Sequence, residues 1–253
     1  MAGETRGRLV LSIDLELVTR AGSLEYQRQL DAVASQLTDA LAQHRLPATI
    51  AVADPLHSAA TEQITASPLG HEIAILGDAS WVGRGAGRER FGRELDRRIH
   101  KARKAGLHVT SLALRNVDLA ENYDLLTSHA LTAIRLGHAS APAQSPLLRF
   151  GMWQVPVSLA LPHTPRWFQS TVRMAKKTLR NAVQSGGIAH LAIDAGRLAE
   201  GEAVRLVEVL RVLAIAGEWQ QAGRLEVLTL QQLVSSLDRP EATAPQRSIL
   251  RAA

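Results

Sequence analysis

Short apolar segments alternate with helical patterns of hydrophobic residues along this chain. The apolar segment from Leu9 to Leu17 predicts a strand, and Leu30, Val33, Leu37 and Leu41 then recur at helical spacing within a predicted helix over 23–44. The remaining predicted strands cover 48–53, 72–76, 109–115, 132–136 and 187–193, and the remaining helices cover 59–66, 88–105, 123–129, 165–184, 202–221 and 229–237. This alternation is typical of βα units around a parallel sheet or barrel.

One apolar segment departs from this pattern. The segment 152–162 is extended in character but contains Pro156 and Pro162. Because proline has no backbone N–H to donate, we expect this segment at an edge of the sheet and not at its centre. No repeat and no linker divides the chain, so we predict a flexible N-terminus over 1–8, one α/β domain over 9–237 and a loose tail over 238–253.

Composition narrows the choice of class. The chain has 253 residues, of which 46% are hydrophobic, and this is enough to fill a substantial core. It has no cysteine, which excludes disulfides, thiolate metal ligands and a cysteine nucleophile. The N-terminal residues do not form a signal-peptide core, and no apolar run is long enough to span a bilayer. We therefore expect a cytoplasmic protein without a membrane span.

The net charge of +5 raises the question of a nucleic-acid partner. The densest basic run, 84–104, also contains Glu89, Glu94 and Asp96 at helical spacings, as a solvated helix face does. Aromatic residues make up only 4% of the chain, so stacking platforms for bases are scarce. We predict no nucleic-acid partner.

Polar residues that could carry chemistry follow the predicted strands. In parallel α/β folds the functional groups lie at the carboxyl ends of the strands, which meet at one rim. Here these positions are occupied mostly by carboxylates and one arginine: Asp14, Glu16, Asp54, Asp78, Arg115 and Asp194. Asp14 and Glu16 are two residues apart, so in a strand they face the same side while Leu15 faces the other.

Five segments carry a resemblance to a known family. They are Ser12-Ile-Asp-Leu-Glu, the run from His71 to Trp81, Leu114-Arg-Asn-Val, the run from Gly151 to Ser158, and the run from Gly187 to Gly196. In order and spacing they resemble the motifs of the polysaccharide deacetylases of carbohydrate esterase family 4, over about Leu9 to Leu237. The resemblance implies a single (β/α)7-type distorted barrel, and an activity that removes N-acetyl groups from sugars with a divalent metal.

The resemblance also implies a role for several residues. Asp14 matches the family's general base, and Glu16 resembles a variant Asp-x-Glu arrangement, although it also suits a solvated strand end. Arg115 matches the arginine that hydrogen-bonds the catalytic aspartate, and Asp194 falls at the position of the general acid. Trp153 matches a residue lining the sugar site, where it would stack on a pyranose ring; burial in the core is the alternative.

The metal-ligand positions of the family are altered here. Leu15 occupies the place of the metal-binding aspartate, and Leu76 and Ser80 occupy the places of a histidine pair. Leucine has no lone pair to donate and a serine hydroxyl is a poor ligand, so the imidazoles that suit zinc are missing. His71 and His190 match positions that are not ligands or catalysts, and we interpret both as structural. We predict no resident metal.

Three functions stay open from the sequence. The first is a divergent deacetylase-like protein with lost or much weakened de-N-acetylase activity, which binds a carbohydrate or an N-acetylated small molecule. The second is an active hydrolase in which Asp14, Glu16, Asp78 and Asp194 form a carboxylate set able to hold Mg²⁺ or Mn²⁺. The third is a scaffold protein without a small-molecule site. The motifs Gly-x-Ser-x-Gly, His-Glu-x-x-His and Gly-x-x-x-x-Gly-Lys are absent.

Overall fold

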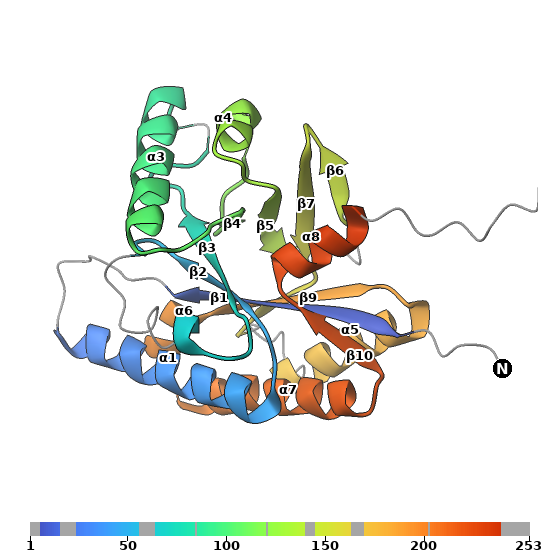
Figure 1. The fold of residues 1–253 in the computed structure, drawn as a ribbon. Helices are drawn as coiled ribbons and strands as arrows, with labels where there is room; N and C mark the ends of the chain where they lie inside the picture. The colour runs from blue at the N-terminus through green and yellow to red at the C-terminus, as the bar shows by residue number, and fades with distance from the viewer. Residues whose placement is uncertain are drawn as a thin grey trace, which may run out of the picture.

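The alternating segments fold into a mixed α/β structure around a curled half-barrel sheet (Figure 1). The computed structural model describes residues 6–15, 24–55, 64–83, 85–119, 121–139, 145–162, 170–201 and 203–238. Its strands are β1 (Gly7–Leu15), β2 (Thr49–Val52), β3 (Glu72–Gly77), β4 (Ser111–Leu114), β5 (Ala133–Ala139), β6 (Leu147–Arg149), β7 (Met152–Val157), β8 (Leu159–Leu161), β9 (Ile188–Asp194) and β10 (Leu225–Leu228). Its helices are α1 (Leu24–His44), α3 (Arg88–Lys104), α4 (Tyr123–Ser128), α5 (Thr171–Ser185), α6 (Ala195–Ala199), α7 (Ala203–Gln221) and α8 (Leu230–Asp238).

Strand β1 pairs with three other strands, β2, β9 and β10. The strands follow the order β6-β7-β5-β4-β3-β2-β1-β9-β8, and β10 also pairs with β1. Apart from the antiparallel β6–β7 pair, the ladders are parallel, which brings the carboxyl ends of the strands to one rim. In the register of β1 with its neighbours, Asp14 lies beside Ala51 and Asp194. The expected α/β barrel-type fold is confirmed.

The two faces of β1 have different neighbours. Leu9, Leu11, Ile13 and Leu15 belong to the large core between the sheet and the helices. Val10, on the other face, packs inside the half-barrel. Ser12 and Asp14 share the face of Val10 because strand side chains alternate. Leu15 therefore points away from the face that carries Asp14, as the sequence predicts.

Helices cover the outer face of the sheet. In α1 the buried residues Leu30, Val33, Leu37 and Leu41 form one stripe, which explains why this sequence folds as an amphipathic helix. Helix α1 packs on α7, and α5 packs on α7 and β1 (Figure 1). Within the described ranges, no helix combines the length and apolar character needed to cross a membrane.

Helix α8 closes the half-barrel on the side where the strands begin. Its residues Leu230, Leu233 and Val234 pack against Val10 and Val155. Its first turn is also fixed by hydrogen bonds, because the backbone N–H of Leu230 donates to Thr49 Oγ1 and that of Gln231 donates to a carboxylate oxygen of Glu72, both at 2.8 Å. The opposite side, where the strands end, is the rim.

Several predicted boundaries shift in the structure. Strand β7 is paired on both sides at Trp153 and Gln154, so the prediction of an edge strand is wrong there. Pro156 is tolerated because it lies beyond the part paired with β6 and opposite a register shift in β5 between Arg135 and Ala139. Helix α5 begins at Thr171 with Ser170 as its N-cap, later than predicted. The predicted helix over 59–66 is described only from residue 64, where it is helical. Strands β6 and β10 and helix α6 were not predicted.

Candidate functional site

Asp14 is bound by an arginine that reaches it from across the half-barrel. Arg135 of β5 donates to both carboxylate oxygens of Asp14, with Nη2 to Oδ2 at 2.8 Å. The same guanidinium donates to the backbone oxygen of Leu114 at 3.0 Å and to Ser12 Oγ at 3.2 Å. Arg135 is 2% exposed and Asp14 is 5% exposed. This bidentate ion pair engages both carboxylate oxygens of Asp14 and fixes their orientation.

His190 lies behind this pair and takes no part in the rim. Its Nε2 lies 2.8 Å from Ser12 Oγ, and both residues are buried. Burial, and then the positive charge of Arg135, lower the pKa of His190 to about 3. The imidazole is therefore neutral near pH 7, so Ser12 can accept from Arg135 and donate to Nε2.

Asp194 stands beside Asp14 at the end of β9. It caps α6 by accepting from the backbone N–H of Arg197 at 3.0 Å, and it forms an ion pair with Arg115, whose Nη2 lies 2.9 Å from Oδ2. Burial raises the pKa of Asp194; the N–H of Arg197 and the charge of Arg115 oppose that rise, and the charge of Asp14 adds to it. Asp194 is thus the rim carboxylate whose protonation is made easier.

A small cavity of about 70 Å³ joins these groups. Charged groups form one part of its lining: Asp14, Arg115, Arg135, Asp194 and Arg197. Apolar side chains form another part: Leu136, Val157, Ala160, Leu161 and Ala192. Three arginines and two aspartates give this lining a surplus of one positive charge. The cavity therefore combines an apolar wall with hydrogen-bond donors and one carboxyl group of raised pKa.

Gly137 allows the loop after β4 to shape this cavity. A Cβ atom at position 137 would lie 2.3 Å from the backbone oxygen of Val117, so any side chain would push the loop away. The backbone N–H of Asn116 donates to the oxygen of Gly137 at 3.2 Å. This close approach fixes the segment that carries Arg115 and Asn116, both of which line the cavity.

The structure brings three predicted residues together, since Asp14, Arg115 and Asp194 all line the cavity. Their pairing differs from the prediction. Arg115 was expected to hydrogen-bond Asp14, but it binds Asp194, while Arg135 binds Asp14. The signal for Arg135 is present in the sequence, because an arginine inside an apolar strand needs a buried partner of opposite charge.

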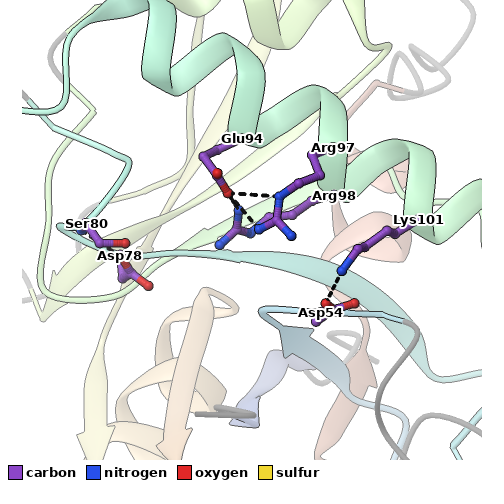
Figure 2. Close-up of polar contacts among 7 residues, drawn as sticks. All are labelled: Asp54, Asp78, Ser80, Glu94, Arg97, Arg98 and Lys101. Carbon is purple, nitrogen blue, oxygen red and sulfur yellow. Dashed lines mark hydrogen bonds and ion pairs between the residues drawn. The ribbon is translucent and has the colours of Figure 1, made fainter. Parts of the chain in front are cut away.

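The other predicted site residues do not line this cavity. Asp78 follows β3 and accepts from the backbone N–H of Ser80 at 2.7 Å, below helix α3 in Figure 2. Trp153 lies near the start of β7, where it packs with the cluster around α8 and donates to Asp238 at 2.7 Å, away from the rim. The expectation that Trp153 lines a site at the rim therefore fails, because the residue starts its strand instead of ending it. Glu16 lies outside the described residues.

The residues at the family's metal positions do not fit a metal ion. Leu76 is buried in an apolar layer with Ala51, Ala74 and Ala113, and Ser80 is exposed. Both oxygens of Asp14 accept from Arg135, whose positive charge lies beside the position that a cation would take. Across the described ranges, no group of three or more histidine, cysteine, aspartate or glutamate residues is placed to hold a metal. Among the described residues, the groups that could coordinate a metal here are too few, and the arginines beside them add positive charge that disfavours a cation.

His71 has a structural contact. The backbone N–H of Ala48 donates to His71 Nδ1 at 3.1 Å, which ties the start of β3 to the segment before β2. Burial lowers the pKa of His71, and the bond from Ala48 opposes this change. The contact explains why an imidazole stands here without any link to the rim.

Comparison with solved structures identifies the fold. A protein assigned as a polysaccharide deacetylase from Mycobacterium smegmatis superposes with a TM-score of 0.70 at 16% identity, covering 95% of this chain and 96% of that one. This chain has the polysaccharide deacetylase fold. The Puue allantoinase follows with a TM-score of 0.65 at 12% identity, covering 93% and 91% of the two chains. A family 4 acetyl xylan esterase from Clostridium thermocellum, in complex with a cobalt ion, gives 0.53 at 14% identity and covers 92% of each.

The likeness to the deacetylase fold is one of structure. No family model matches the sequence of this chain, and no curated protein matches it either. Identities of 16% or less leave the chemistry of the rim to be argued from the residues that this chain has.

Proposed function

We propose that this chain is a divergent polysaccharide deacetylase-like protein in which metal-dependent de-N-acetylation is lost or much weakened. The bidentate pair between Arg135 and Asp14 carries the proposal. In the family that the chain resembles, Asp14 would take a proton from water, but here both of its oxygens already accept from a buried guanidinium. A metal ion lowers the pKa of bound water from about 15.7 toward about 7, and without one the attack on an amide faces a large barrier.

The cavity supports a retained ligand site. Its volume of about 70 Å³ suits a group of a few heavy atoms, such as the acetyl group of an N-acetylated sugar or small molecule. The apolar wall around Val157 and Ala160 would receive a methyl group, and Arg115 or Arg197 would donate to a carbonyl oxygen. A charged cavity beside Asp14 favours such a ligand site over a scaffold protein without one.

A second candidate function rests on Asp194. Its raised pKa makes it a group that can carry a proton near the carboxylate of Asp14, as a general acid must. Metal-independent hydrolysis of an N-acetylated substrate, or of another C–N bond, is the activity this would support. A carboxylate-bound metal is a weaker option, because Asp78 bonds within its own loop and does not line the cavity.

Acetate release from N-acetylated oligosaccharides tests the proposal. The protein is treated with a chelator, dialysed, and assayed with and without added Zn²⁺, Co²⁺, Mn²⁺ or Mg²⁺, alongside Asp14→Asn and Asp194→Asn. We expect no turnover that depends on metal. Slow turnover that survives the chelator and is lost in Asp194→Asn would establish the second candidate. Metal-dependent turnover that Asp14→Asn abolishes would overturn the proposal.

A further inference from the structure

Helix α5 presents a row of cations on its outer face. Arg173, Lys176, Lys177 and Arg180 are all exposed, and their spacing of three, four and seven residues places them on one side of the helix over about 10 Å. The 15 residues of α5 include no aspartate or glutamate. The four cations therefore have no acidic residue on their own helix, whereas the basic residues of α3 are interspersed with Glu89, Glu94 and Asp96.

Helix α3 is also rich in basic residues, but several of them form ion pairs with carboxylates. On α3, Glu94 forms ion pairs with Arg97 and Arg98, and Lys101 pairs with Asp54 just after β2 (Figure 2). Glu89 also pairs with Arg93. On α5, none of the four cations forms an ion pair with a described carboxylate. Within the described part of the chain, no carboxylate therefore cancels the positive field of α5.

The cations of α5 also border a surface hollow of about 950 Å³. Ser170 and Asn181 line it together with the four cations, and add neutral hydrogen-bonding groups. No aromatic ring and no carboxylate occurs among its described lining residues. Such a surface suits a chain-like ligand with repeated negative charges and many hydroxyl groups.

Two other anionic partners fit this surface less well. Single-stranded nucleic acid gains much of its affinity from bases stacked on aromatic rings, and aromatic residues make up only 4% of this chain. A membrane-bound amphipathic helix inserts its apolar side, but the apolar residues Ala175, Leu179 and Ala182 of α5 are buried in the protein core. A hollow also matches a single polymer chain better than a flat bilayer.

We propose that the outer face of α5 binds an acidic polysaccharide, a glycan that carries carboxylate or sulfate groups. This surface is separate from the rim cavity, whose lining shares no residue with it. The inference therefore stands whether or not the rim has hydrolytic activity.

Binding of the full-length protein to heparin and to polygalacturonate tests the proposal, with neutral dextran as the uncharged control. Lys176→Gln/Lys177→Gln removes two charges from the row, while Arg103→Gln/Lys104→Gln removes two adjacent exposed charges from the end of α3. We expect the α5 variant to bind the acidic glycans about 30-fold more weakly, the α3 variant to bind within about twofold of wild type, and dextran not to bind. Thermal unfolding of each variant checks that its fold is intact.

Two outcomes of this binding experiment would contradict the proposal. Equal losses in the α3 and α5 variants would mean that only net charge matters, and would overturn the proposal. It would also fail if a DNA oligonucleotide, single-stranded or duplex, or a phosphatidylserine vesicle bound more tightly than the acidic glycans at the same salt concentration.

Discussion

Two buried carboxylates of the half-barrel interior, Glu72 and Asp14, are stabilised in different ways. Glu72 starts β3 on the side closed by α8, and it accepts hydrogen bonds from Thr49 and Ser111 hydroxyls and from the Gln231 N–H. Asp14 lies near the rim end of β1 and is held by the charge of Arg135. Their exposed fractions are almost the same, at 6% and 5%. Burial alone therefore does not mark a functional carboxylate; its partners and the space beside it do.

The partners explain the different uses of these two groups. Burial raises the pKa of Glu72, and its hydrogen bonds only partly offset that rise. A carboxyl group held by neutral hydrogen-bond donors suits a structural role, which here is to anchor the first turn of α8. Asp14 instead faces a cavity and shares it with Asp194 and Arg115, where a ligand has room. Four sets of substitutions test this contrast, from the largest expected effect to the smallest.

Replacement of Arg135 should have the largest effect. Arg135→Met removes the counter-charge and leaves Asp14 buried without a charged partner, so we expect a loss of about 3–5 kcal/mol in the free energy of unfolding. Arg135→Met combined with Asp14→Leu should recover much of this loss, since both charges are then absent. Urea unfolding measures both values. A loss below about 1 kcal/mol in the single variant would show that the pair contributes little to the fold.

Replacement of Glu72 should have a smaller effect that depends on pH. Glu72→Gln replaces one carboxylate oxygen with an NH₂ group that faces hydrogen-bond donors. We therefore expect the free energy of unfolding to fall by about 1–3 kcal/mol. The pKa of Glu72 is raised in the folded protein, so its contribution is full below its ordinary value of 4.5 and falls as pH rises through the folded value. The stability gap between wild type and Glu72→Gln should thus narrow with rising pH. A gap that widens instead would contradict this assignment.

Changes around Asp194 should alter its pKa more than the stability of the fold. Because the charge of Arg115 lowers the pKa of Asp194 and the charge of Asp14 raises it, Arg115→Met should shift that pKa upward and Asp14→Asn should shift it downward. Carboxyl ¹³C NMR titration follows Asp194 directly. Shifts of the same sign in the two variants would show that the two groups do not act on Asp194 as the geometry indicates.

The smallest effect is expected at Asp78, which serves as the reference. Asp78→Asn keeps an oxygen that can accept from the Ser80 N–H and leaves the cavity lining unchanged. We expect the free energy of unfolding, measured with urea, to change by no more than about 0.5 kcal/mol. Binding of N-acetylated ligands should not change. A loss of ligand binding would place Asp78 in the site.

The sequence predicts the frame of this site better than its contacts. Alternation and strand length place Asp14 and Asp194 at the same rim, because neighbouring parallel strands end together. An arginine in an apolar strand indicates a buried partner for Arg135, but that this partner is Asp14 depends on the curl of the sheet, which brings β5 opposite β1. Pro156 led to the wrong prediction of an edge strand for a related reason, because an irregular register in the neighbouring strand β5 accommodates it. The absence of carboxylates from α5 can be read directly from its sequence, but the exposure of its four cations on one side requires the folded helix.

The metal content of the purified protein tests the central claim most directly. Wild type and Asp14→Asn would be equilibrated with Zn²⁺ or Co²⁺, dialysed, and analysed for metal bound per chain. The donor set around Asp14 and Leu76 predicts well under one ion per chain in both proteins, with no difference between them. One ion per chain in the wild type that is lost in Asp14→Asn would contradict the claim that the Arg135 pair replaces a metal site.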